Sequence, residues 1–170
     1  MTPVSALLSG ILTRDLTSLR KEIEAYPAEP DLWRRAEGIT NSGGTLALHL
    51  AGNLQHFIGA VLGKTGYVRN RDAEFAERDV PRAEVLHRID AALAAVQDTL
   101  AGLSDADLGR EYPLPVGKVR VETADFVIHL ATHLAYHLGQ VDYHRRMVTR
   151  TGTTVSTVAP WRLHTAREDA

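Results

Sequence analysis

The chain contains no cysteine among its 170 residues. This absence excludes disulfide bonds, thiolate zinc sites, iron–sulfur clusters held by protein thiolates and a cysteine nucleophile. Any sulfur chemistry would therefore need a thiol that a substrate brings in. Histidine, by contrast, is abundant, with eight copies, and several of them share one segment of the sequence.

The chain also lacks an excess of charge and a long apolar run. Nineteen basic and twenty-one acidic residues give a formal net charge of −2, which is no reason to expect nucleic acid or an anionic membrane as a partner. No apolar stretch approaches the roughly 18 residues that a membrane-spanning helix needs. Arg14 and Asp15 come too early for a signal peptide. We therefore expect a cytoplasmic protein that binds neither nucleic acid nor a membrane.

Four amphipathic segments make up most of the sequence. Apolar residues at three- and four-residue steps predict helices over about 4–25, 43–62, 80–101 and 123–149. The second helix is almost uncharged and apolar on several faces, which is typical of a helix in the middle of a bundle. The residues expected to cap the last three helices are Ser42 or Asn41, Asp79, and Thr123.

This pattern predicts an all-α four-helix bundle over residues 1–150, followed by a polar tail over 151–170. A long polar connection, residues 63–80, joins the second and third helices, and connections of this length are often functional. Residues 103–122 contain two prolines and predict irregular structure with one short extended piece.

The fourth helix carries a stripe of polar side chains. At about 100° per residue, His129, His133, His137, Gln140 and His144 fall within an arc of about 80°. A solvated face would normally carry Lys, Glu and Arg in place of imidazoles. Buried histidines with protein partners, or a titrating cluster, are a second interpretation. Crowded neutral imidazoles leave ring nitrogens without partners, however, so a bound metal ion explains the stripe best.

A metal site would draw on two helices. His133 and His137 are four residues apart, a spacing that lets two rings bind one ion, and the pair His129 and His133 has the same spacing. The second helix offers His49 as a third ligand. Three histidines with an open fourth position make a site of the catalytic type. Nitrogen ligands suit zinc, nickel, copper or iron, and we expect one such divalent ion per chain.

Three motifs resemble the DinB-like superfamily. The last-helix signature of that superfamily, H-x-x-x-H-x-G-Q, is similar to residues 129–144, HLATHLAYHLGQVDYH. The residues that carry this match are His133, His137, Gly139 and Gln140. The second-helix motif is similar to residues 49–57, HLAGNLQHF, and a loop of one subfamily of unassigned function resembles residues 69–75, RNRDAEF. The resemblance covers about residues 5–150.

The resemblance implies a four-helix bundle with a long crossover between its second and third helices, which the polar connection described above could form. It also implies a homodimer and a divalent metal ion held by His49, His133 and His137. Characterised members of the superfamily are metal-dependent transferases or isomerases that use a low-molecular-weight thiol such as bacillithiol, mycothiol or glutathione. His129 and His144 are not ligands in the motif, so their roles stay open.

We therefore expect a metal-dependent enzyme in which the metal activates a small thiol for transfer to an electrophile. The candidates for contacts with the substrate or with the metal ligands are Asn53, His56, His129 and Gln140. Arg69 and Arg71 are candidates for binding an anionic group of the substrate. Plain solvation, with a contact between Arg71 and Asp72, explains these two arginines equally well.

Two other functions stay open. A hydrolase would activate water at the same metal, but no carboxylate is placed as an obvious general base, because Asp125 is near the start of the fourth helix and Asp142 lies off the stripe. A non-enzymatic metal-binding protein, dimeric and acting in stress or protein interaction, would need a fourth protein ligand. His129 or His56 could then close the coordination shell.

Overall fold

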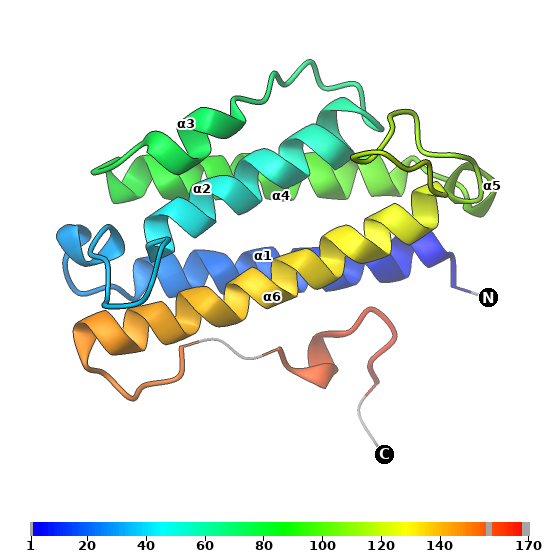
Figure 1. The fold of residues 1–170 in the computed structure, drawn as a ribbon. Coiled ribbons are helices and arrows are strands. Elements are labelled where there is room, and N and C mark those ends of the chain that lie inside the picture. Colours follow the sequence, from blue (N-terminus) through cyan, green and yellow to red (C-terminus); the bar gives the residue numbers. More distant parts are fainter. Residues whose placement is uncertain (1, 156–157, 168–170) are drawn as a thin grey trace.

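The computed structural model describes residues 2–155 and 158–167. Four long helices form a bundle: α1 (Val4–Glu24), α2 (Gly43–Leu54), α4 (Arg82–Ala101) and α6 (Thr123–Thr149) (Figure 1). The predicted all-α four-helix fold is confirmed. The predicted bounds of α1, α4 and α6 agree with the structure to within two residues, because each of these helices has an apolar stripe that faces the core.

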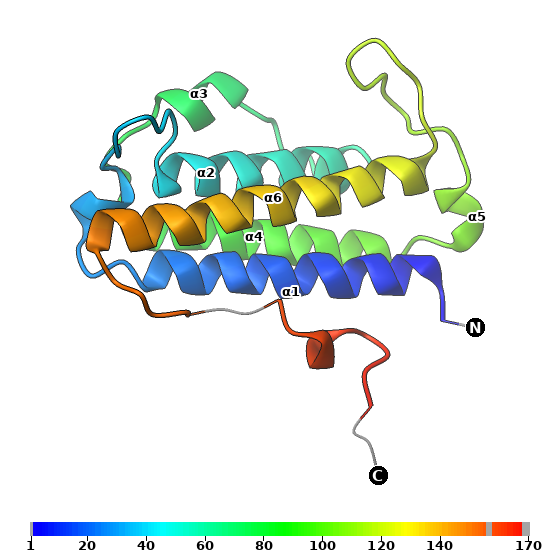
Figure 2. The same cartoon turned by 60° about the horizontal axis from the view of Figure 1, so that its bottom comes forward.

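The order of the helices around the core explains the long connection. α1 lies against α4 and α6, and α2 lies against the same two helices from the other side. Figures 1 and 2 show that α2 and α4 run in one direction and that α1 and α6 run in the other. Parallel neighbours need a connection that returns along the bundle. Residues 61–81 make this return, so the expected crossover between the second and third long helices is present.

The second long helix changes geometry before its predicted end. α2 stops at Leu54 and continues as a turn of π-helix, η2 (Gln55–Ala60). Every residue of α2 is buried, as expected for a helix in the middle of the bundle. Its cap is Ser42, as predicted, because the Thr45 N–H donates to Ser42 Oγ at 3.2 Å.

The other two predicted caps are wrong. α4 begins at Arg82, directly after Pro81, and Asp79 lies two residues outside the cap position with a left-handed φ of 55°. The fixed φ of proline already suits the start of a helix. Thr123 is the first residue of α6, and its hydroxyl donates to the carbonyl oxygen of Arg110 at 2.9 Å. That bond ties α6 to the preceding connection.

The remaining elements lie in the connections between the long helices and in the tail. These are η1 (Glu29–Leu32), α3 (Arg71–Ala76), α5 (Asp105–Leu108) and η3 (Pro160–Arg162). Residues 103–122 contain α5 and two isolated bridges, Glu111 with Glu122 and Val116 with Val119, where a short extended piece was expected. Among the described residues, no helix is both long enough and apolar enough to cross a membrane.

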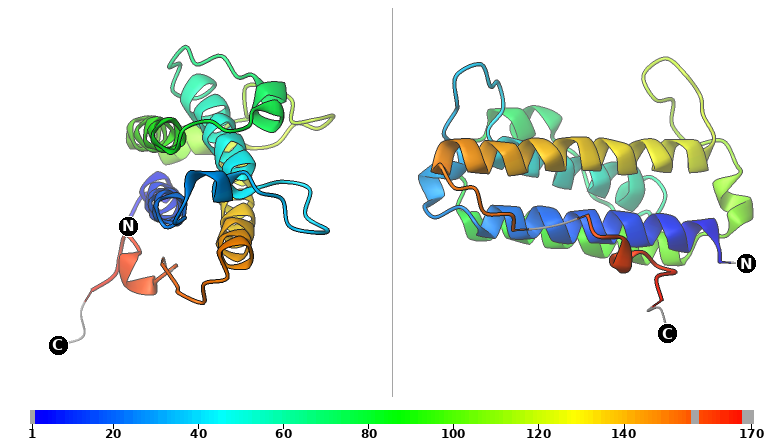
Figure 3. Two further views of the ribbon diagram at one scale, coloured as in Figure 1. Left: turned by 90° about the vertical axis from the view of Figure 1, so that its left-hand side faces the viewer. Right: turned by 90° about the horizontal axis from the view of Figure 1, so that it is seen from below.

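A buried ion pair joins α1 to α6. Arg145 Nε donates to Glu22 Oε2 at 2.6 Å, and both side chains are 2% exposed. Arg145 Nη2 also donates to the carbonyl oxygen of Thr153 at 2.9 Å, which holds the first residues of the tail against α6. The tail lies outside the bundle, on the side away from α3 (Figure 3). The predicted domain boundary at residue 150 stays a prediction.

Candidate metal centre

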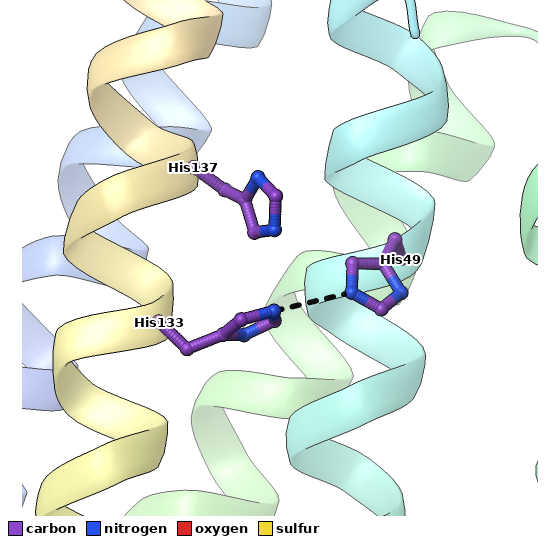
Figure 4. Close-up of side chains that lie close together, drawn as sticks. All are labelled: His49, His133 and His137. Atoms are coloured by element: carbon purple, nitrogen blue, oxygen red, sulfur yellow. Dashed lines mark hydrogen bonds between the residues drawn. The ribbon is translucent and has the colours of Figure 1, made fainter.

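Three of the predicted histidines meet between two helices. His49 comes from α2, and His133 and His137 come from α6 (Figure 4). One ring nitrogen of each lies within 4.8 Å of those of the other two. The Nε2 atoms of His49 and His133 are 3.4 Å apart. The three rings stand at 82° to 90° to one another, so they approach a shared point from different directions.

A carboxylate fixes the orientation of His49. The Nδ1–H of His49 donates to Glu74 Oε2 at 3.0 Å, because a carboxylate oxygen can only accept. Arg69 holds the same carboxylate through two bonds, from Nε to Oε1 at 2.7 Å and from Nη2 to Oε2 at 2.8 Å. The proton of neutral His49 is thus on Nδ1, and its Nε2 lone pair is directed into the centre.

A second partner orients His137. Its Nδ1–H donates to Gln140 Oε1 at 2.6 Å, which leaves Nε2 of His137 without a proton. Gln140, one of the predicted contact residues, therefore orients the ring of a histidine on its own helix. The Nδ1 atom of His133 is buried without a hydrogen-bond partner among the described residues.

The surroundings of His133, His137 and Glu74 shift the pKa of each toward the protonation state that metal binding requires. Burial, together with the neighbouring imidazoles, lowers the pKa of His133 to about 4. Burial also lowers the pKa of His137, although the bond to Gln140 opposes the shift. Burial would raise the pKa of Glu74, but the bonds from Arg69 and His49 outweigh it and lower that pKa. At neutral pH His133 and His137 are therefore neutral and Glu74 is charged, as metal binding requires.

Sequence reasoning missed Glu74, although Arg69 in the same connection was a candidate. α3 carries Glu74 over α2, where it rests on Gly52, one turn after His49. A Cβ added at Gly52 would lie 2.2 Å from Glu74 Oε1. A glycine in an otherwise apolar buried helix was the one signal that another group approaches α2 closely. Phe75 completes this cover, with its ring centre 4.8 Å from that of His49.

The donor set fits a divalent transition metal ion. Two nitrogen ligands that are each about 2.1 Å from one zinc ion, at an angle of about 109°, lie about 3.4 Å apart. The Nε2 atoms of His49 and His133 have this separation. Among the described residues the group consists of imidazoles alone, which suits zinc, nickel, copper or iron better than magnesium or calcium.

The other predicted contact residues surround this group without joining it. Buried Asn53 Oδ1 and His56 Nδ1 have no hydrogen-bond partner among the described residues. His129 is exposed and stacks on Phe126, with ring centres 5.9 Å apart. Arg71 is also exposed, and its guanidinium lies 5.0 Å from the ring centre of Phe75. Neither His129 nor His56 places a nitrogen in the three-histidine group.

His144 has a structural partner set of its own. Its Nε2–H donates to the backbone oxygen of Arg34 at 2.8 Å, and its Nδ1 accepts from the Tyr26 hydroxyl at 2.7 Å. Gly43 makes room for this contact, since a Cβ there would lie 2.1 Å from the Tyr26 oxygen. The last histidine of the stripe is thus a satisfied buried histidine, which was the second interpretation of the stripe.

A comparison with protein families matches residues 11–141 to the family described as the DinB superfamily. The chain belongs to the DinB superfamily. The match covers all four long helices in whole or in part, including the three histidines. The DinB-like motifs in the sequence and the DinB family match therefore agree on the same region. Comparison with the curated proteins finds no match.

Proposed function

We propose that this protein is a metal-dependent enzyme that activates a low-molecular-weight thiol and transfers it to an electrophile. The three-histidine group carries the proposal, because it includes no fourth protein ligand among the described residues. A divalent zinc, nickel or iron ion, one per chain, would lower the pKa of a coordinated thiol and so supply a thiolate near neutral pH. The chain has no cysteine, so the thiol would be a substrate.

The residues around the group have separate tasks in this proposal. His49, His133 and His137 would hold the ion. Glu74 keeps the proton of His49 on Nδ1, and Gln140 does the same for His137. The guanidinium of Arg69 is bound to Glu74 through two nitrogens, which supports a positioning task more than the binding of an anionic substrate group.

The state of Glu74 favours thiol transfer over hydrolysis. Many metal-dependent hydrolases use a carboxylate as a general base toward the metal-bound water. Glu74 is the carboxylate beside His49, yet its two oxygens accept from Arg69 and His49, and its pKa is lowered. A bound metal ion would acidify a thiol and a water molecule alike, so the state of Glu74 counts against a hydrolase that depends on a carboxylate base, whereas thiol transfer requires no carboxylate.

An epoxide illustrates the reaction. The sulfur–carbon bond forms as a carbon–oxygen bond of the strained ring breaks, and the ring oxygen gains a proton in place of the one that the thiol lost. Asn53 Oδ1 and His56 Nδ1, which find no partner in the described part of the structure, would bind polar groups of the thiol substrate. A cytoplasmic homodimer is also part of the proposal, by analogy with the relatives, and sedimentation analysis would test the dimer.

Metal content tests the first half of the proposal. Purified protein should contain close to one transition metal ion per chain, and His49→Ala and His133→Ala should each lose most of it. His87→Ala is the matched control, since His87 is exposed on α4, outside the group. Equal retention in all three variants would refute the ligand assignment.

Reaction products test the second half. Metal-loaded protein is incubated with styrene oxide and with glutathione, bacillithiol or mycothiol in turn, and products are identified by mass spectrometry. The proposal predicts a thioether that forms faster with metal-loaded than with metal-stripped protein. A diol formed without any thiol would indicate a hydrolase, and no product from fully loaded protein would indicate a binding protein.

A further inference from the structure

We propose that a cavity beside the metal centre binds the electrophile, and that this substrate is uncharged and mostly apolar. The cavity lies between α6 and residues 38–41, and its volume is about 430 Å³. This size is within the usual range of about 300–1,000 Å³ for small-molecule sites. The inference rests on the proposed thiol transfer and adds the class of the second substrate.

Both helices of the metal centre continue into the cavity wall. Leu46 lines the cavity and precedes His49 by three residues on α2, or about one turn. On α6 the wall includes Gln140 and His144, one and two turns beyond His137. Leu46 and Gln140 are thus each three residues, or about 4.5 Å along the helix axis, from a histidine of the group, which places the cavity next to the metal centre.

The cavity lining selects against charge. Its apolar members include Ile39, Leu46, Tyr143 and Met147, and within the described part of the chain no Lys, Arg, Asp or Glu lines it. His144 adds no charge, because both of its nitrogens are already bonded and burial lowers its pKa. An ionised substrate group would lose hydration here without gaining a partner of opposite charge.

Gln140 connects the cavity to the chemistry. Its Oε1 accepts from His137, so its two amide N–H groups are the part left to donate to a ligand. A donor on the cavity wall suits an uncharged substrate with one oxygen acceptor, such as an epoxide or a ketone. The same side chain would then orient His137 and the electrophile together.

Met147, which lines this cavity, can report whether a ligand occupies it. The chain has two methionines, Met1 and Met147, and Met147 is a lining residue that is 50% exposed. Protein labelled with methyl-13C methionine therefore gives one reporter in the cavity and one at the N-terminus. Acetophenone, an uncharged aromatic ketone, serves as the probe, and benzoate is the charged probe of similar size. The expected result is a saturable shift of the Met147 signal with acetophenone and at least a tenfold weaker response to benzoate.

Two isoleucines provide a matched pair of variants. Ile39→Asp places a charge in the cavity wall, and we expect it to weaken acetophenone binding at least tenfold. Ile128→Asp places the same charge on α6 at a residue that does not line the cavity, and it should bind acetophenone like the unmodified protein. Both isoleucines are partly exposed, at 38% and 48%, so neither change removes a core side chain. Tyr143→Asp, at a lining residue that is 68% exposed, repeats the test from the helix side.

The outcomes separate the two proposals. Absence of a Met147 shift, equal binding of benzoate, or unchanged binding in both Ile39→Asp and Tyr143→Asp would overturn the cavity assignment, whatever the thiol assay gives. With styrene oxide as substrate, the same variants should raise the KM for the epoxide and leave the KM for the thiol and the metal content unchanged. Acetophenone binding as expected, with no thioether formed in any assay, would refute thiol transfer and with it the role of the cavity as an electrophile site.

Discussion

Glu74 decides which nitrogen of His49 is free to bind a metal ion. Its charged oxygen can only accept, so it keeps the proton on Nδ1. In Glu74→Gln the side-chain amide can donate to Nδ1 instead, which favours the tautomer with its proton on Nε2. We expect metal affinity to fall about 10- to 100-fold, as measured by competition with a chromophoric chelator.

Glu77→Gln is the control for that change. Glu77 follows α3 in the same connection, and its Oε2 accepts from Arg88 at 2.8 Å, on α4 rather than at the centre. The Glu77→Gln protein should therefore bind metal as tightly as the unmodified protein. Equal losses in the two variants would show that the whole connection matters and that the bond to His49 does not.

Gly52 makes the approach of Glu74 possible. Because an added Cβ would lie 2.2 Å from Glu74 Oε1, Gly52→Ala should displace the carboxylate and weaken metal binding about 10-fold or more. Gly139→Ala is the matched helical control, since nothing lies within 4 Å of its added Cβ. It should retain full affinity and gain up to about 1 kcal/mol of helix stability. The account fails here if Gly52→Ala also binds metal as tightly as the unmodified protein.

The sequence was enough to identify His133 and His137, which belong to one helix. It was not enough to identify Glu74, which reaches the metal centre only in the folded chain. His133 and His137 could be paired because the helical period alone brings them to one face. Glu74 is 25 residues from His49 in the sequence and reaches it only because the crossover returns over α2. No local pattern records such a contact.

Among the elements, α6 shows why one helical stripe can have two roles. The helical period places His144 on the same face of α6 as His133 and His137. The elements that pack against this face change, however, along the 27 residues of the helix. Near the middle it faces α2, whereas near its end it faces Tyr26 and the connection that leads into α2. The periodicity of the sequence fixes the face of a helix but not the element that packs against it.

His144 should make the stability of the protein depend on pH. Burial lowers its pKa in the native state, so the unfolded chain takes up a proton first as the pH falls below the ordinary value of about 6.5. Stability is therefore fully present above pH 6.5 and declines below it. Chemical denaturation of metal-stripped His144→Gln at several pH values should give a shallower decline between about pH 6.5 and 5 than the unmodified protein.

His87→Gln controls for the loss of an arbitrary histidine. His87 is exposed on α4, and this variant should reproduce the pH dependence of the unmodified protein. The contributions of His133 and His137 are common to all three proteins, so they do not affect the comparison. A decline in His144→Gln as steep as in the unmodified protein would contradict the assigned role.

The helices themselves were predictable to different degrees. α1, α4 and α6 carry long apolar stripes, and burial of such a stripe determines a helix whatever surrounds it. α3 has six residues and no stripe, so its sequence resembles that of any polar connection. The sequence also showed no sign of the π-helical turn after Leu54, because residues 55–60 continue the apolar pattern of α2.

The bundle as a whole depends on a buried ion pair between its first and last helices. Glu22→Gln would remove the carboxylate that lies 2.6 Å from the buried guanidinium of Arg145 and leave it with the longer bond to Asp142 Oδ1, at 3.2 Å. Removing one partner of a buried pair costs about 3–5 kcal/mol, and the remaining Asp142 carboxylate places the expected loss at the lower end of that range, about 3 kcal/mol. The free energy of unfolding, from urea denaturation, should fall by this amount.

An exposed pair on the same helix provides the comparison. Glu24 is paired with Arg20, and its side chain is 44% exposed, so Glu24→Gln should cost less than about 1 kcal/mol. A loss of the same size in Glu22→Gln and Glu24→Gln would mean that the buried pair contributes no more than a surface pair. The tail should loosen only in the first variant, because Arg145 also holds Thr153.

The central claim is that His49, His133 and His137 bind one divalent ion and leave a position for a substrate. X-ray absorption spectroscopy of the metal-loaded protein counts imidazole ligands directly. We predict three imidazoles and at least one oxygen ligand, from water. An added thiol should replace that oxygen with sulfur. Four imidazoles, fewer than three, or an unchanged coordination sphere in His49→Ala would contradict the account.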